Sequence, residues 1–191
     1  MRALLQRVER ASVRIGEGDG VTVGAIGPGL MVLLGVGPRD DESVADALAG
    51  TVAELRIFRD ENRRTNRSLI DVEGEALVVS QFTLYADTRR GRRPGFTGAA
   101  APELAERCYL RFIAALRALG VATEGGRFGA EMRVELVNDG PFTVWLDSDV
   151  RSLRSVSTSL RRLLVIGPFS AVVPTTMPRA SARKTVMMET M

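Results

Sequence analysis

Residues 30–36 read Leu-Met-Val-Leu-Leu-Gly-Val, an unbroken apolar run. A continuous apolar run of this length is typical of a strand that is covered on both faces. The preceding Gly27-Pro28-Gly29 favours a turn, so the run has a defined beginning. We therefore expect residues 30–36 to form the central strand of a sheet, with the other elements arranged around it.

Periodicity on either side of this run predicts the remaining elements. Residues 3–15 and 21–26 flank a glycine-rich turn and indicate a hairpin that opens an antiparallel sheet. Apolar residues recur at helical spacing in 40–56 and again from Pro102 to about Gly120. Further strands are predicted over residues 75–84, 121–124, 132–137 and 142–146. The order is β-β-β-α-β-α-β-β-β, an α/β fold in a single domain of residues 1–147.

Histidine is absent, and Cys108 is the only cysteine. A Ser-His-Asp triad, a Cys-His pair and a zinc site of the usual ligands are therefore excluded. Cys108 falls in the second helical pattern and is expected to pack as a small apolar side chain. We predict no metal and no cofactor. A hydrolase of this composition has to use backbone donors, carboxylates, hydroxyls or groups of its substrate.

The hydropathy of the chain predicts a soluble protein. Apolar residues make up 45% of the 191 residues, yet no run approaches the roughly 20 residues that span a bilayer. Charges interrupt the first residues, MRALLQRVER, so no signal sequence is predicted. We expect a cytoplasmic protein with no membrane partner.

Positive charge is unevenly distributed. The net charge is −2 over residues 1–147 and +5 over residues 148–191. The basic, Ser- and Arg-rich extension 148–191 is expected to be poorly ordered, although residues 157–166 have the composition of a short basic helix that contacts RNA or a membrane surface. Within 1–147 the basic clusters are Arg63, Arg64 and Arg67, and Arg89, Arg90, Arg92 and Arg93. Such clusters either contact phosphates or are solvated loop charges.

Two polar segments stand out. Ser80-Gln81-Phe82-Thr83-Leu84 places a hydroxyl and an amide where an apolar strand ends, and Asn138-Asp139-Gly140-Pro141-Phe142-Thr143 lies between two predicted strands. Taken alone, the first could satisfy neighbouring backbone groups, and the second is rich in turn residues.

Together with other motifs, these segments closely resemble the D-aminoacyl-tRNA deacylase family from Met1 to about Leu146. The matching segments are Leu5-Gln6-Arg7-Val8, Ala11-Ser12-Val13, Ser80 to Asp87, Arg89 to Pro94 with Phe96, Gly126 to Ala130, and Asn138 to Thr143. The resemblance implies a homodimer with a three-layer α/β/β sandwich. It also implies hydrolysis of the ester of D-aminoacyl-tRNA, and of mischarged glycyl-tRNA, as chiral proofreading in translation.

The resemblance also assigns roles to residues. It implies that Gly140-Pro141 is a cis peptide inserted into the partner's active site, where it rejects L-amino acids, and that Arg7 braces it. It implies catalytic roles for Ser80, Gln81, Phe82 and Thr83, and substrate contacts for Leu84 and Asn138. The arginines expected to contact tRNA are Arg89, Arg90, Arg92 and Arg93.

The resemblance implies that hydrolysis uses the terminal ribose 2′-hydroxyl of tRNA, together with backbone amides of the protein that hold the substrate carbonyl. A nucleophilic Thr83 is the alternative, but no histidine is present to activate its hydroxyl. Phe142 departs from the smaller aliphatic residue usual in the family, and residues after Asp147 are not covered by the resemblance. Two rival interpretations remain, a non-catalytic RNA-binding dimer and a generic esterase that uses Ser80.

Overall fold

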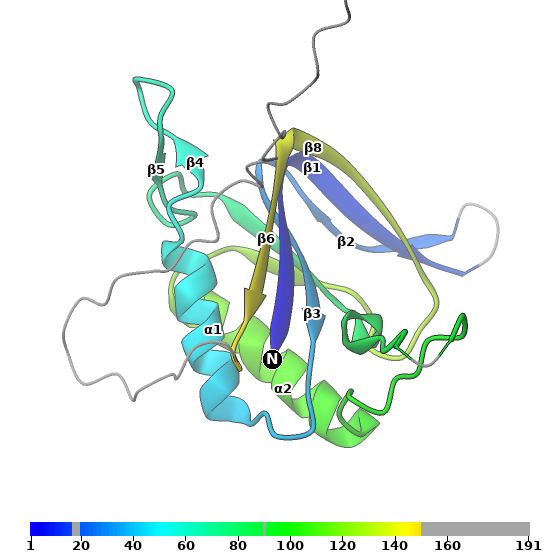
Figure 1. Cartoon of the computed structure of the whole chain (residues 1–191). Helices are drawn as coiled ribbons and strands as arrows, with labels where there is room; N and C mark the ends of the chain where they lie inside the picture. Colours follow the sequence, from blue (N-terminus) through cyan, green and yellow to red (C-terminus); the bar gives the residue numbers. More distant parts are fainter. Residues whose placement is uncertain (17–19, 90, 150–191) are drawn as a thin grey trace, which may run out of the picture. The chain divides into compact units, whose positions relative to one another are not determined.

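A computed structural model describes residues 1–16, 20–89 and 91–149 (Figure 1). These residues form a mixed α/β fold with one six-stranded sheet, a two-stranded hairpin and two α-helices. The strands are β1 (Arg2–Ile15), β2 (Val21–Ile26), β3 (Gly29–Gly35), β4 (Phe58–Arg59), β5 (Thr65–Arg67), β6 (Glu75–Ser80), β7 (Thr123–Gly125) and β8 (Met132–Asp147). The helices are α1 (Glu42–Glu54), the 3-10 helix η1 (Phe82–Tyr85) and α2 (Pro102–Ala118).

Strand β1 organises the sheet because it is long enough to pair with three other strands. It is antiparallel to β8, to β3 along residues 2–8 and to β2 along residues 11–15. Strand β6 then joins β3, and β7 joins β6, both in parallel. The pairing of β1 with β8 shifts register on both sides of Val8, which is where the two strands bend.

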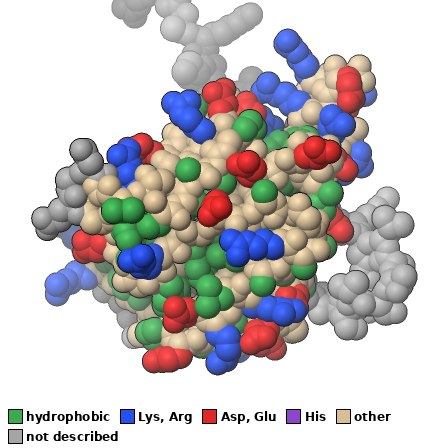
Figure 2. Space-filling model, turned by 180° about the vertical axis from the view of Figure 1, so that it is seen from behind, with side chains coloured by type: hydrophobic (Ala, Val, Ile, Leu, Met, Phe, Trp, Pro, Cys, Tyr) green, Lys and Arg blue, Asp and Glu red, His purple; other side chains and the backbone are tan. Residues whose placement is uncertain are grey.

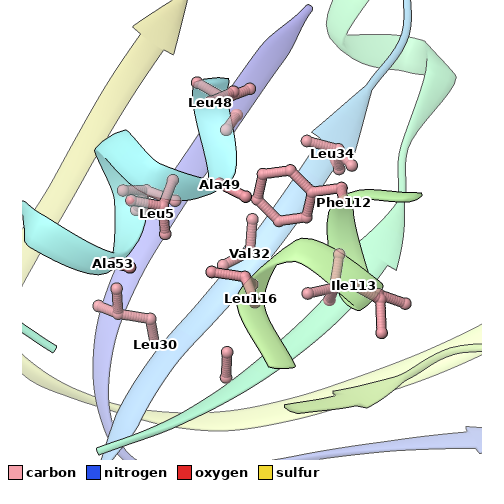
Figure 3. Close-up of a cluster of buried hydrophobic side chains, with 14 of the residues drawn as sticks. Leu5, Leu30, Val32, Leu34, Leu48, Ala49, Ala53, Phe112, Ile113 and Leu116 are labelled. Atoms are coloured by element: carbon pink, nitrogen blue, oxygen red, sulfur yellow. The ribbon is translucent and has the colours of Figure 1, made fainter. Parts of the chain in front are cut away.

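The buried apolar side chains form two clusters, one on each face of the sheet, because successive residues of β3 point to opposite faces. Leu30, Val32 and Leu34 pack with helices α1 and α2, whereas Met31 between them faces the opposite side of the sheet. Figure 3 shows the helix-side cluster around Phe112. On the opposite side, Met31 packs with residues of β6 and with the second half of β1. Both faces of β3 are therefore covered, as its sequence predicted.

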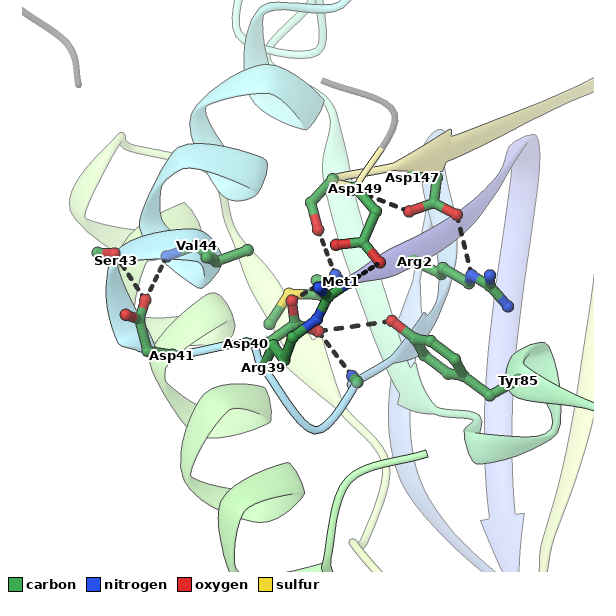
Figure 4. A network of polar contacts seen from close by, with 12 residues as sticks. Met1, Arg2, Arg39, Asp40, Asp41, Ser43, Val44, Tyr85, Asp147 and Asp149 are labelled. Carbon is green, nitrogen blue, oxygen red and sulfur yellow. Dashed lines mark hydrogen bonds and ion pairs between the residues drawn. The ribbon is translucent and has the colours of Figure 1, made fainter. Parts of the chain in front are cut away.

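A buried polar network fixes the start of β1 (Figure 4). The amino group of Met1 is paired with the Asp40 carboxylate at 2.6 Å and also contacts the Ser148 hydroxyl. Asp40 accepts further hydrogen bonds from the Gly37 N–H at 2.6 Å and the Tyr85 hydroxyl at 3.5 Å. The network thus ties β1 to the loop before α1 and to η1.

The structure corrects three details of the predicted element order. Residues 132–147 form one strand instead of two strands separated by a turn, because residues 139–142 bulge out of β8 while Asn138 and Thr143 on either side stay paired with β1. The strand predicted over residues 75–84 ends at Ser80 and continues as η1. The hairpin β4–β5 was not predicted at all.

Two other predictions concern single features. Cys108 is fully buried in the helix-side core, which confirms its structural role. Neither α-helix in the described part of the chain has the length and hydropathy of a membrane span. The predictions for residues 150–191 and for Arg90 lie outside the described residues.

Candidate active site

A pocket of about 690 Å³ opens where β6 ends. Its walls come from five parts of the chain: the residue after β3, the end of β6 with η1, the loop that leads into α2, α2 itself, and the segment before and within β8. The lining residues are Val36, Val79, Ser80, Gln81, Phe82, Phe96, Ala99, Ala100, Pro102, Ala105, Phe128, Gly129, Ala130, Glu131, Met132 and Val134. The wall is mostly apolar, with Ser80, Gln81 and Glu131 as its polar side chains.

The change from strand to 3-10 helix places backbone donors at the pocket. Gln81 still donates its backbone N–H to the Leu34 carbonyl at 2.8 Å, as the last ladder bond of the sheet. The next residues, Phe82 and Thr83, begin η1, and the first N–H groups of a helix have no partner within it. The Gln81 side chain does not cap them. This end of η1 can therefore donate to an oxyanion or a carbonyl oxygen.

Among the residues that the structure describes, the Thr83 hydroxyl has no hydrogen-bond partner that could act as a base. Its hydroxyl accepts a hydrogen bond from the side-chain amide of Gln81. An amide N–H is a donor and cannot take the hydroxyl proton. Thr83 and Leu84, moreover, do not line the pocket, whereas Ser80, Gln81 and Phe82 do. The geometry favours a positioning role for Thr83.

Aromatic rings frame the pocket; Phe82 was among the predicted site residues, whereas Phe96 and Phe128 were not. Phe82 is 56% exposed and meets Phe96 edge to face, with ring centroids 5.0 Å apart. Phe128 lies on the other side and is 6.0 Å from the ring of Tyr109. Aromatic residues make up only 5% of the chain, and Phe96 and Phe128 each lie next to a glycine in a loop. Their rarity and their position in loops could have indicated that they belong to the site.

Arg2 holds η1 from behind. Its guanidinium donates to the Leu84 carbonyl at 2.9 Å and to the Asp147 carboxylate at 3.0 Å. It also lies over the ring of Tyr85, 4.2 Å from the centroid. Burial, followed by the charge of Asp40, raises the pKa of Tyr85, so this hydroxyl stays protonated and serves as a structural group.

The second predicted site segment, residues 138–142, lies on the bulge of β8. Gly140 and Pro141 are exposed, and the peptide bond between them is cis. The Asn138 side chain closes the bulge by accepting from the Phe142 N–H at 2.9 Å and donating to the Phe142 carbonyl at 3.2 Å. Asn138 therefore shapes the segment.

Arg7 supports this segment from inside the protein, where it is only 3% exposed. Its Nε donates to the Asp139 carbonyl at 3.0 Å and is 2.8 Å from the Asp139 carboxylate. Its Nη1 donates to the Ile57 carbonyl at 2.6 Å, and the guanidinium lies 4.6 Å from the Phe142 ring centroid. The aromatic ring at position 142 thus stacks on the bracing arginine.

The two segments do not meet within one chain. Val134 is the last pocket residue on β8, and Gly140 lies six residues further along that strand. At about 3.3 Å per residue the separation along the strand is about 20 Å. Hence the Gly140-Pro141 peptide cannot reach the pocket of its own chain.

The loop after η1 that contains residues 89–93, called the arginine loop below, is closed at its base by a β-bridge. Asp87 and Gly95 form a bridge at its base, and Arg89 makes a two-pronged ion pair with Asp87 at 2.8 and 2.9 Å. The Arg89 side chain, followed by the Arg89 backbone N–H, lowers the pKa of Asp87 to about 2. The charge of Arg89 is therefore largely compensated, whereas Arg92 and Arg93 are exposed and make no ion pair with other described residues.

Comparison with solved structures defines the class of protein. The c-Myc DNA Unwinding Element Binding Protein aligns with a TM-score of 0.71 and 38% identity, over 77% of this chain and 98% of that chain. A probable eukaryotic D-amino acid tRNA deacylase shares the fold, with a TM-score of 0.66 and 20% identity over 76% of this chain and 97% of that chain. The chain is thus a mixed α/β protein of the fold of these two proteins.

Comparison of sequences then gives the family. The family model of D-Tyr-tRNA(Tyr) deacylase matches residues 4–147. The D-aminoacyl-tRNA deacylase of Paracoccus denitrificans is 58% identical over 152 residues, which are 80% of this chain and 100% of the relative. That of a Roseiflexus species is 61% identical over 150 residues, 78% of this chain and 95% of the relative. The chain belongs to the D-Tyr-tRNA(Tyr) deacylase family.

Proposed function

We propose that this protein hydrolyses the ester bond between a D-amino acid and the 3′ end of tRNA, with mischarged glycyl-tRNA as a second substrate. Water adds across the ester, the bond from the carbonyl carbon to the ribose oxygen breaks, and free tRNA and the amino acid leave. The observation that carries the proposal is the mostly apolar pocket at the end of β6, which is lined by Phe82, the first residue of η1. Membership of a deacylase family supports the same assignment.

The active unit is proposed to be a homodimer in which each subunit inserts Gly140-Pro141 into its partner's pocket. The exposure of this peptide and its separation from its own pocket support this arrangement. The backbone carbonyls of Gly140 and Pro141, on the segment that Arg7 braces, would then collide with an L side chain and leave room for a D side chain. Selectivity arises by rejection, which needs a rigid wall more than an attractive contact.

The chemistry is proposed to use the substrate's own 2′-hydroxyl as the proton-handling group. The Phe82 and Thr83 N–H groups stabilise the negative charge that develops on the carbonyl oxygen, as preorganised donors do in other acyl transfers. Ser80 and Gln81 form part of the wall, Leu84 is proposed to contact the substrate from η1, and Thr83 positions Gln81. The arginines at 89, 90, 92 and 93 are proposed to contact tRNA phosphates, in the cytoplasm where aminoacyl-tRNA is used.

A deacylation assay tests the proposal directly. Labelled D-tyrosyl-tRNA and L-tyrosyl-tRNA are incubated with catalytic amounts of protein, and release of tyrosine is followed. We expect turnover of the D-ester only. Tight tRNA binding without turnover would instead support a non-catalytic nucleic-acid-binding dimer. The similarity to the c-Myc DNA Unwinding Element Binding Protein is the reason to include this alternative. Hydrolysis of small activated esters, abolished by Ser80→Ala, would support a generic esterase.

A further inference from the structure

The hairpin β4–β5 projects from the body of the domain (Figure 1). Its sequence carries an excess of positive charge. Residues 56–67 contain five arginines, all exposed, and two acidic residues. The arginines are Arg56, Arg59, Arg63, Arg64 and Arg67. Figure 2 shows several basic side chains on this projection. A net charge of +3 on so short a segment is uncommon in a domain whose net charge is negative.

The acidic residues of the hairpin do not neutralise its tip. Asp60 accepts hydrogen bonds from the backbone N–H groups of Asn62 and Arg64, both at 2.9 Å, and builds the turn. Glu61 is paired with Arg67 at 3.4 Å. The guanidinium groups of Arg59, Arg63 and Arg64 make no ion pair or hydrogen bond with any other residue that the structure describes. Three cations are therefore presented to solvent on a turn of fixed geometry.

The base of the hairpin lies next to the Gly140-Pro141 bulge. Arg7 donates to the Ile57 carbonyl, one residue before β4, and to the Asp139 carbonyl on the bulge. A single buried guanidinium therefore holds both segments. If the bulge enters the partner's pocket, the hairpin stands at the mouth of that same pocket. From Ile57 to the tip at Arg63 the chain can extend about 20 Å outward.

The chemistry of the hairpin favours RNA over a lipid surface. Between Arg59 and Arg67 it exposes arginines, asparagines and a threonine, and no apolar side chain. Membrane-surface elements combine basic residues with apolar anchors, which are missing here. Arginine guanidinium groups on a polar turn can each donate two hydrogen bonds to a phosphate, and the phosphates of a nucleic-acid backbone are regularly spaced.

We infer that hairpin β4–β5 of each subunit binds the ribose-phosphate backbone of the tRNA whose aminoacyl end occupies the partner's pocket. The inference rests on the proposed function and adds a contact distant from the arginine loop after η1. It assigns the hairpin to affinity for the tRNA body, with no part in the chemistry at the ester.

The test compares Arg63→Ala/Arg64→Ala with Arg107→Ala/Arg111→Ala in the full-length protein. The second variant removes the same charge from α2, where the arginines pair with Glu42 at 3.6 Å and Asp46 at 2.6 Å. With D-tyrosyl-tRNA we expect the hairpin variant to raise KM about tenfold at 0.1 M salt and to leave kcat unchanged. Its salt dependence should flatten by about 1.5 in the log–log slope, since each phosphate contact contributes about 0.7–0.9. The α2 variant should behave as the wild type.

Three further measurements separate the possible failures. D-tyrosyl-adenosine, which lacks the tRNA body, should be hydrolysed equally by all three proteins; a loss in the hairpin variant would overturn the inference, because the hairpin would then act through the bulge. The inference would also be overturned if the hairpin variant and the α2 variant lost the same amount of affinity for D-tyrosyl-tRNA. Binding of uncharged tRNA is measured independently, so that the contact is tested even if the wild type proves not to hydrolyse D-tyrosyl-tRNA. Preferential binding of the wild type to anionic vesicles over tRNA would assign the hairpin to lipid and overturn the inference.

Mixed dimers test the cross-subunit placement. One subunit carries an inactivated pocket, Gln81→Ala/Phe82→Ala, and an intact hairpin, while the other carries Arg63→Ala/Arg64→Ala and an intact pocket. The working pocket is then served by the intact hairpin of its partner, and we expect the wild-type KM. A KM raised to that of the hairpin variant would assign the hairpin to its own subunit's pocket and overturn the placement.

Discussion

Replacing Arg7 tests how firmly the bulge of β8 is held. The side chain is almost fully buried and contacts Ile57, Asp139 and Phe142 at once. Arg7→Ala removes the donors of two backbone carbonyls and leaves the Asp139 carboxylate without its partner. Arg7→Lys keeps the charge, but a compact ammonium cannot reproduce the planar fork that reaches Ile57 and Asp139 together.

The expected loss follows from these contacts. Breaking a buried ion pair by removing one partner costs about 3–5 kcal/mol. The Asp139 side chain is 39% exposed and regains water, so the lower end, about 3 kcal/mol, applies to Arg7→Ala. In a domain of this size each kcal/mol lowers Tm by about 2–4 °C, which gives a decrease of about 6–12 °C. Arg7→Lys should lose about half as much.

Thermal unfolding at fixed protomer concentration measures the loss, and hydrolysis of D- and L-tyrosyl-tRNA measures its effect on the site. Both variants should lose D-over-L discrimination in proportion to the loosening of the bulge. A Tm within 2 °C of the wild type, or undiminished discrimination in Arg7→Ala, would refute the bracing role.

Five further predictions concern other parts of the protein. Gly140→Ala should abolish activity, because a Cβ at this position would lie 2.0 Å from the Phe142 backbone nitrogen; a variant with wild-type turnover and Tm would contradict the steric argument. Asp87→Asn should free Arg89 and increase tRNA affinity several-fold, with a salt slope steeper by up to about 0.9, and unchanged binding would exclude Arg89 from the interface. The Asp87–Arg89 pair should itself be insensitive to pH between 5 and 9, since the pKa of Asp87 is lowered to about 2 and the pairing is lost only as the pH falls from about 4 through that value. EDTA should not affect turnover, because the described residues contain no group of three or more metal-ligating side chains; restoration of a lost activity by zinc would overturn this. Cys108 is buried with a raised thiol pKa, so iodoacetamide should modify it only in urea, and rapid native labelling would show that α2 opens.

The sequence predicted the elements whose apolar patterns match their burial. The run at residues 30–36 became β3 with both faces covered, and Ala76 to Val79 became the buried part of β6. The second helix, expected from Pro102 to about Gly120, extends from Pro102 to Ala118. In these segments local periodicity and tertiary packing favour the same structure.

Elements stabilised by polar contacts were not predictable in the same way. Residues 138–143 have turn composition, yet pairing of Asn138 and Thr143 with β1 keeps the segment within one strand, with residues 139–142 as a bulge. The hairpin β4–β5 has no hydrophobic alternation, and its turn depends on hydrogen bonds to Asp60. The pocket joins Phe96 and Phe128, which are far apart in the sequence, so only the folded chain brings them together.

The pairing of β1 with β8 has a consequence for biosynthesis. The first strand to leave the ribosome has as its neighbour the last strand of the domain, from Arg2 with Asp147 to Ile15 with Met132. At roughly 5–20 residues per second, the nascent β1 waits on the order of ten seconds for that neighbour. During this interval a strand with alternating apolar residues presents an open edge, and open strand edges promote aggregation. Expression yield should therefore depend on chaperones that shield nascent chains, and slower translation of residues 20–130 should lower it.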